Sequence, residues 1–252
     1  MFLLSPDYWE IKKTKNKGKG VFAKKNIIAG TIIGDYLGKI IRKDDEEKYE
    51  DKYGFYAMYY HERATIFPEV KQPGIHLINH SCMPNCYMYT YQGHTLYFAL
   101  RRIFAGEELT VSYLVSPLDD DCSPCTHLCE CGTALCINSM HTPTHYYDKW
   151  TEFDNKLMED VKLPRVTFGK ELAQLPSYPA EISDNPIFPL FGAADQPVFS
   201  MDDTKFPSQH ILRKSMREHG QNLYFANLGI TIIGIFDNNI LCNNAKQETP
   251  TT

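Results

Sequence analysis

Apolar side chains come in short runs along the first half of this chain, broken by glycine, proline and charged residues. These runs are rich in β-branched and aromatic residues, as is typical of strands. No apolar repeat of helical spacing extends over several turns before residue 145. We therefore expect a mostly β architecture, with a short surface helix or loop in the polar stretch 42–52. The expected strands lie within 21–23, 31–37, 53–60, 96–100 and 108–112.

The pattern changes after residue 140. Apolar residues recur at near-helical spacing at Trp150, Phe153, Leu157 and Val161, which predicts a helix over 148–161. Residues 164–207 are proline-rich, and 223–241 return to strand-like runs. These features predict an α+β C-terminal extension over 143–243, followed by a disordered tail over 244–252.

The charge of the chain is divided unevenly. Residues 1–113 carry a net charge of +3 and residues 114–252 a net charge of −8, which gives −5 over 252 residues. Direct binding of nucleic acid is not expected, since it needs a clearly basic surface. The acidic half suits a basic peptide substrate, although a solvated acidic surface is the ordinary alternative.

Membrane segments are not expected either. The first four residues are too short an apolar run for a signal peptide, and the run 228–236 is far below the ~20 residues of a membrane helix. We expect an intracellular protein, nuclear or cytoplasmic. Eight cysteines, several of them at metal-ligand spacing, then fit zinc better than disulfides.

Three motifs follow one another in a specific order. Asn79-His80-Ser81-Cys82-Met83-Pro84-Asn85-Cys86 comes first, Gly106-Glu107-Glu108-Leu109-Thr110-Val111-Ser112-Tyr113 second, and Cys129-x-Cys131-x4-Cys136 third. With Gly18-Lys19-Gly20 upstream, they resemble a SET domain followed by its post-SET segment, the family of lysine methyltransferases that use S-adenosylmethionine. The resemblance covers roughly residues 8–142. It implies a SET domain over 8–115, with small curved β-sheets around a pseudoknot, and a post-SET zinc segment over 116–142.

The resemblance also implies a cofactor site. In the family the glycine loop lets the backbone approach the methionine part of the cofactor, and the Asn-His bend binds its amino group and adenine edge. One departure is His76, which stands where the family often has arginine and can alter the affinity or orientation of the cofactor. The residues expected at the cofactor are Lys17, Gly18, Lys19, Gly20, Tyr53, His76, Asn79, His80, Tyr113 and His141.

Tyr113 is the expected catalytic residue. Methyl transfer to a lysine amine is an in-line displacement that needs a neutral, aligned amine in a dry channel. In the family the tyrosine that ends the Gly-Glu-Glu-Leu strand orients this amine. Ser112 replaces the aspartate that many members have, and Val111 replaces the aromatic residue that tunes methyl number. Tyr87 or Tyr89 can tune the number of methyl groups instead, and the sequence does not settle which of the two does so.

The cysteines suggest one structural zinc site. Three thiolates come from Cys129, Cys131 and Cys136, and tetrahedral zinc takes four ligands. The resemblance supplies Cys82 as the fourth. Cys122 and Cys125 are alternative ligands or free thiols.

Two functions from different classes remain open. The first is an active protein-lysine methyltransferase acting on a basic, lysine-containing segment, with a histone tail as one possibility. The second is a catalytically inactive SET module that binds a peptide or partner through residues 145–252. A zinc-ribbon nucleic-acid binder is disfavoured by the acidic half. A microbial protein acting in a host is an open alternative.

Overall fold

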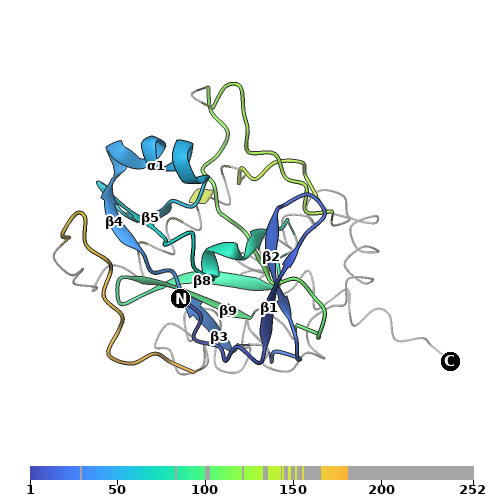
Figure 1. The fold of residues 1–252 in the computed structure, drawn as a ribbon. Coiled ribbons are helices and arrows are strands. Elements are labelled where there is room, and N and C mark those ends of the chain that lie inside the picture. Colours follow the sequence, from blue (N-terminus) through green and yellow to red (C-terminus); the bar gives the residue numbers. More distant parts are fainter. Residues whose placement is uncertain are drawn as a thin grey trace.

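The computed structural model describes residues 1–28, 30–82, 84–99, 103–120, 122–132, 136–142, 144, 147–148, 151, 155 and 166–180. Within them the fold is built from small sheets, with the short helix α1 (Glu46–Tyr53) on one side (Figure 1). Two single 3₁₀ turns accompany it, η1 (Lys43–Asp45) and η2 (Ile75–Leu77). The mostly β prediction is confirmed.

The sheets are small and mostly antiparallel. β1 (Trp9–Lys13) pairs with β2 (Lys19–Ala23) as a hairpin. A second sheet has the order β3 (Ile32–Asp35), β9 (His94–Ala99), β8 (Cys86–Tyr91). A third has the order β4 (Lys39–Arg42), β6 (Ala64–Phe67), β5 (Met58–His61). The exception is the parallel pair β7 (Asn79–His80) and β10 (Thr110–Val111).

Local sequence explains several element ends. Gln92 and Gly93 both have positive φ and join β8 to β9 as a two-residue hairpin turn, in which Tyr91 pairs with His94. Gly54 ends α1 with φ 99°, a conformation that glycine adopts without strain. Tyr53 is therefore the last residue of α1, not the start of a strand as predicted, and the strand begins only at Met58.

The core lies between the sheets. Four strands, β2, β3, β6 and β9, contribute fully buried side chains to it. These are Val21, Ile33, Ile66, Leu96 and Phe98. Burying a side chain of this size contributes roughly 1.5–3 kcal/mol. The core thus holds the β2 hairpin and the two three-stranded sheets in one unit.

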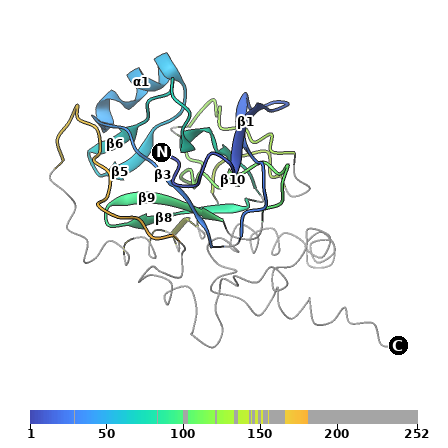
Figure 2. The same cartoon turned by 60° about the horizontal axis from the view of Figure 1, so that its bottom comes forward.

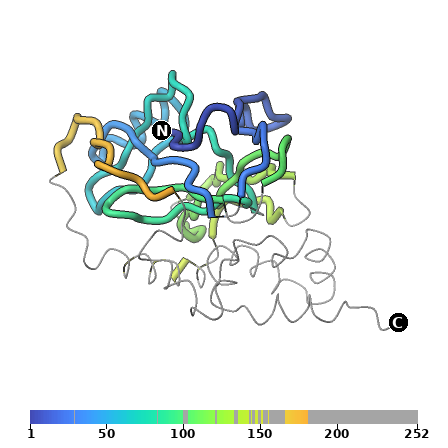
Figure 3. The backbone as a smooth tube through the Cα atoms, turned by 90° about the horizontal axis from the view of Figure 1, so that it is seen from below, coloured from blue at the N-terminus to red at the C-terminus, as the bar shows by residue number. Residues whose placement is uncertain are grey.

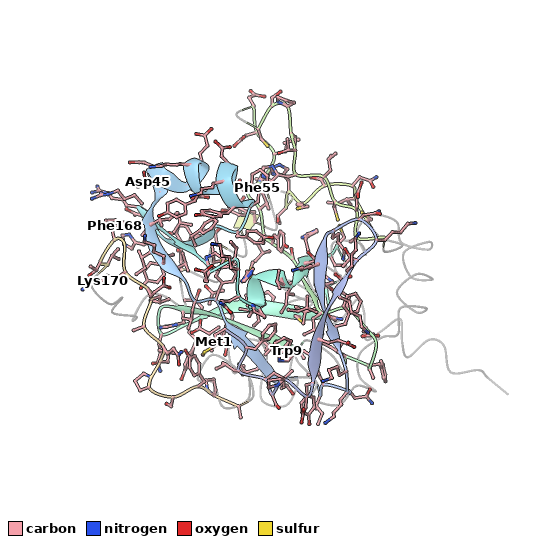
Figure 4. All side chains as sticks on the ribbon, viewed as in Figure 1. Met1, Trp9, Asp45, Phe55, Phe168 and Lys170 are labelled. Atoms are coloured by element: carbon pink, nitrogen blue, oxygen red, sulfur yellow. The ribbon has the colours of Figure 1, made fainter. Side chains whose placement is uncertain are left out.

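Residues 166–180, here called the strap, pack along this unit. The amide of Gly169 donates to the carbonyl of Ile40 at 2.8 Å, and the amide of Leu172 donates to the carbonyl of Gly38 at 2.8 Å. Figure 2 shows the strap in orange passing down the side of the domain, and Figure 3 shows it from below. In Figure 4 the labelled Phe168 and Lys170 lie beside β4. Backbone hydrogen bonds carry part of this packing, and they could not be predicted from the sequence.

The predicted C-terminal elements fall largely outside the described residues. Within the expected helix over 148–161, Asp148, Thr151 and Asn155 are helical. The strand-like run 223–241 and the tail 244–252 are outside the description. The domain boundaries stay predictions.

Candidate functional site

The Asn-His bend and the Gly-Glu-Glu-Leu strand lie side by side. β7 and β10 pair in parallel, with Asn79 opposite Thr110 and His80 opposite Val111. The buried amide of Asn85 extends this pairing, because its Nδ2 donates to the Glu108 carbonyl at 2.8 Å and its Oδ1 accepts from the Thr110 amide at 2.9 Å. This juxtaposition is the one a pseudoknot requires; the threading itself stays a prediction.

The motifs meet around one pocket of ≈ 230 Å³. The glycine loop, the Asn-His bend, the end of the Gly-Glu-Glu-Leu strand and the cysteine segment each contribute to its wall. Residues up to 124 positions apart in the sequence thus face one space. The lining residues are Asn16, Lys17, Asn79, His80, Tyr113, Leu128, Cys129, Glu130 and Met140.

A charged group is fixed at one side of this pocket. The ammonium of Lys17 lies 2.8 Å from Oε2 of Glu108, and both side chains are 19% exposed. Oε1 of the same carboxylate accepts from Nδ2 of Asn79 at 2.9 Å, and this amide nitrogen also donates to the Lys19 carbonyl at 3.0 Å. Sequence reasoning did not assign Glu108 to the site, although the Gly-Glu-Glu-Leu motif contains it.

The two glycines of the loop are required for different reasons. Gly18 has φ 72°, in the left-handed region that favours glycine. A Cβ on Gly20 would lie 2.7 Å from Oε1 of Glu108 and 2.9 Å from Nδ2 of Asn79. A side chain at residue 20 would therefore displace the Glu108 carboxylate and the Asn79 amide.

His80 is neutral and has a defined tautomer. Burial is the main cause that lowers the pKa of His80, to about 4. Its Nδ1 accepts the backbone N–H of Tyr113 at 3.2 Å, so the ring proton is on Nε2. Nε2 lies 3.7 Å from Sγ of Cys82. One imidazole therefore connects the Tyr113 backbone to a cysteine of the next cluster.

Tyr113 carries a neutral phenol. Burial is the main cause that raises the pKa of Tyr113, to about 12. Its hydroxyl donates a long hydrogen bond of 3.4 Å to the Ile78 carbonyl, and its ring meets the His80 ring edge-on at 5.4 Å. At neutral pH the phenol is no base, but its oxygen can accept a hydrogen bond.

Other aromatic residues surround Tyr113. Tyr36 is buried, and its hydroxyl donates to the Tyr56 carbonyl at 2.6 Å. Its ring stacks on that of Tyr97 at 6.3 Å. Burial, with the nearby Tyr113 hydroxyl as a smaller cause, raises the pKa of both Tyr36 and Tyr97. These hydroxyls are uncharged at neutral pH. Sequence reasoning did not assign Tyr36 or Tyr97 to the site, because a buried tyrosine is more often a core residue.

His76 is buried near this group and stays uncharged. Its ring meets that of Tyr56 edge-on at 5.4 Å, and its Nε2 has no hydrogen-bond partner among the described residues. Burial lowers the pKa of His76 to about 4, helped by the Met1 ammonium and opposed by Glu69. The orphaned nitrogen is consistent with a contact to a bound group.

We expect His76 to make folding sensitive to acid. Between about pH 6.5 and 4 the unfolded chain binds a proton at His76 that the folded chain does not. The free energy of unfolding should therefore fall as pH is lowered through this window, by at most about 1.4 kcal/mol per pH unit from this group. Urea unfolding of the wild type and His76→Gln between pH 7 and 5 measures this. The variant should show the shallower slope, and equal slopes would contradict the expectation.

Several predicted site residues lie outside the lining of this pocket. Tyr53 is 39% exposed and packs against Tyr49 and Phe67. Tyr87 and Tyr89 are buried against Phe98 in the core. All the cofactor and catalytic assignments stay predictions, including those of Tyr53, His76 and His141 to the cofactor.

The four cysteines expected at zinc come together as one group, here called the tetracysteine cluster: Cys82, Cys129, Cys131 and Cys136. Their sulfurs lie within 4.8 Å of one another, and Cys82 and Cys129 are 3.5 Å apart. Zn–S distances of about 2.3 Å place tetrahedral sulfurs roughly 3.8 Å apart, so the donor set fits zinc. Hydrogen bonding with the Cys131 and Cys82 thiols, more than burial, raises the pKa of Cys129, an effect that a divalent cation would reverse.

A second group was not expected. Cys122, Cys125, His127 and His141 form a Cys2His2 cluster whose ligand atoms also lie within 4.8 Å of one another. Cys122 and Cys125 were weighed as alternative ligands of the first site, and the structure places them here instead. The signal in the sequence was a histidine two residues after Cys125, which was overlooked.

Comparison with known proteins agrees with these motifs. Residues 18–114 match the family described as "SET domain". This match confirms the resemblance of that part of the chain to a SET domain. A trithorax histone-lysine N-methyltransferase of Drosophila virilis is 34% identical over 139 residues, which cover 52% of this chain and 4% of that protein. Histone-lysine N-methyltransferase 2B of Homo sapiens is 36% identical over 128 residues, 47% of this chain and 5% of that protein.

A third relative is the H3 lysine-36 specific histone-lysine N-methyltransferase of Schizosaccharomyces pombe. It is 30% identical over 159 residues, which cover 59% of this chain and 19% of that protein. The chain thus matches only a small part of each of these relatives. Among the helices of the described residues, none has the length and apolar character needed to cross a bilayer.

Proposed function

We propose that this SET protein transfers methyl groups from S-adenosylmethionine to a lysine of a protein substrate. The observation that carries the proposal is that Lys17, Asn79 and Tyr113 line the same pocket. On one side of the pocket, the charge of Lys17 can bind the amino-acid part of the cofactor. On another side, the Tyr113 hydroxyl can bind the amine of a substrate lysine. The family match and the names of the relatives agree with this chemistry.

The pocket residues fit the methionine part of the cofactor. This part is a zwitterion, and the paired charges of Lys17 and Glu108 offer one partner for its carboxylate and one for its ammonium. Gly20 leaves the space beside them that a side chain would fill. S-adenosylmethionine, when bound, supplies a sulfonium methyl group whose carbon–sulfur bond breaks as a carbon–nitrogen bond forms.

The residues around Tyr113 would favour a neutral lysine amine. The buried hydroxyls of Tyr36, Tyr97 and Tyr113 are uncharged at neutral pH, so they do not stabilise an ammonium as a carboxylate would. Desolvation in such surroundings lowers the pKa of a lysine, and the proton leaves to solvent. The Tyr113 oxygen can then accept a hydrogen bond from the amine and orient its lone pair.

The tetracysteine cluster would hold a structural zinc ion. Cys82 belongs to the Asn-His bend, whereas Cys129 lines the pocket. A metal bound by both would fix the post-SET segment (116–142) against the SET domain (8–115). The ion would supply folding energy to that segment.

A histone tail is the proposed substrate. The relatives named above are histone-lysine methyltransferases, and residues 114–252 carry a net charge of −8 that suits a basic peptide. Its site of action would then be the nucleus. Radiolabelled methyl transfer to purified histones and to a whole-cell extract, with mass spectrometry of the product, tests the proposal. A protein that binds the cofactor but labels nothing in either would favour a binding module instead.

Asn79→Ala should weaken S-adenosylmethionine binding by about 10-fold or more. The substitution removes a hydrogen bond to a charged group and frees Glu108 from its position, and such bonds contribute about 1.5–3 kcal/mol. Isothermal titration calorimetry measures the change. Asn26→Ala is the matched control, because it also removes an asparagine side-chain hydrogen bond, which Oδ1 of Asn26 accepts from the Ala105 amide outside this pocket. Unchanged affinity in Asn79→Ala would contradict the assignment.

A further inference from the structure

The Cys2His2 cluster has the dimensions of a metal site. Sγ of Cys122 lies 3.3 Å from Nδ1 of His127 and 3.4 Å from Nε2 of His141. Sγ of Cys125 lies 4.0 Å and 3.4 Å from the same two nitrogens. In a zinc tetrahedron with Zn–S of about 2.3 Å and Zn–N of about 2.0 Å, sulfur and nitrogen are roughly 3.5 Å apart. The four distances scatter around this value.

The ring of His141 is oriented as a metal ligand. Its Nδ1 lies 2.6 Å from the Ser116 carbonyl, which can only accept, so the ring proton is on Nδ1. Nε2 is then left with a free lone pair, and it is this nitrogen that faces both cysteines. A histidine ligand typically donates its second N–H to a carbonyl in this way. His141 is only 8% exposed, and the carbonyl selects the tautomer that presents Nε2 to the cysteines.

We propose that this cluster binds a second structural zinc ion, separate from the one expected at the tetracysteine cluster. Two thiolates and two imidazoles in a tetrahedral arrangement suit zinc among the common metals. The cysteines are free thiols, not a disulfide. All four protein positions are filled, as in a structural site, so no position is left open for chemistry.

The two clusters are nested along the chain. Three ligands of the tetracysteine cluster, at 129, 131 and 136, lie between His127 and His141. The Met140 amide donates to the His127 carbonyl at 2.9 Å, which also brings the ends of this loop together. The second zinc would therefore close the base of the loop that carries the first.

The base of this loop contacts two other parts of the domain. The Thr142 amide donates to the carbonyl of Val115, two residues after Tyr113. The ring of His127 lies 5.9 Å from that of Phe55, which is 67% exposed at the end of α1. Figure 1 shows the green segment that leads into this loop rising beside α1, and Figure 4 labels Phe55 near the end of α1. The second zinc would hold Leu128, which lines the pocket, between these two contacts.

Zinc content and coordination test this proposal on the full chain, purified under reducing conditions. We expect two zinc ions per wild-type chain by elemental analysis. X-ray absorption at the zinc edge should give an average of three sulfurs and one nitrogen per ion, since one site has four sulfurs and the other two of each. Cys125→Ser and His127→Asn should each retain one ion, with four sulfur ligands. His61→Asn is the matched control and should retain both.

One zinc per wild-type chain, with sulfur ligands only, would overturn the proposal. So would two ions that both persist in Cys125→Ser and His127→Asn. The wild-type count and coordination decide even if a variant fails to fold. Because neither measurement depends on methyl transfer, failure of the methyltransferase proposal leaves this test unaffected.

Discussion

Replacing Tyr113 with phenylalanine should lower the rate of methyl transfer by roughly 10²-fold, while folding and cofactor binding persist. The change removes one hydroxyl and little volume, and that hydroxyl makes only a 3.4 Å hydrogen bond to the Ile78 carbonyl. A preorganised polar contact to the reacting group is worth about this much in rate. Single-turnover transfer with saturating S-adenosylmethionine measures the chemical step, and calorimetry measures binding.

A control variant distinguishes loss of the Tyr113 hydroxyl from loss of any tyrosine hydroxyl. Tyr59→Phe removes a hydroxyl from a residue that is 62% exposed on β5, and its rate should equal that of the wild type. If Tyr113→Phe transfers methyl at the wild-type rate, the Tyr113 hydroxyl does not orient the amine. If the wild type binds cofactor and methylates no histone or extract protein, the binding-module hypothesis becomes the better one.

The sequence predicted the parts of the site that motifs carry. Asn79, His80, Tyr113 and Cys82 could be named because the motifs that contain them resemble those of the SET family. Cys129, Cys131 and Cys136 also have the spacing of metal ligands. The hydrophobic periodicity of the sequence could not predict that these motifs lie next to one another in the fold. This arrangement depends on the parallel pairing of β7 with β10, between residues 31 positions apart.

Other features leave little trace in the sequence. The strap is held in part by backbone groups, such as the Leu172 amide that donates to the Gly38 carbonyl, and almost any residue can supply these. Tyr53 was expected in a strand near the cofactor because aromatic residues favour strands. The glutamates and lysines before it, and Gly54 after it, instead make it the last residue of a helix. His127 was overlooked because its partner His141 is 14 residues away.

Loss of the tetracysteine zinc should be as damaging as loss of Tyr113. Cys131→Ser removes one of four ligands, and we expect that site to lose its ion. Cys129 lines the pocket. Cys82 contacts the His80 ring, which accepts a hydrogen bond from the Tyr113 amide. A shift of about 1 Å in such groups can cost roughly 10²-fold in rate. Elemental analysis and methyl transfer on the same sample measure both effects.

The fold of the β domain should survive this substitution, because its core lies in the strands and contains none of Cys129, Cys131 and Cys136. Far-ultraviolet circular dichroism and the urea unfolding midpoint test that expectation. Cys242→Ser is the matched control, since Cys242 lies outside the cysteine motifs of the sequence, and both zinc content and rate should stay at the wild-type level. A Cys131→Ser protein that loses zinc but keeps the wild-type rate would show that the pocket is organised without the metal. The contacts from Cys82 through His80 to Tyr113 would then be a consequence of the fold and not a requirement for catalysis.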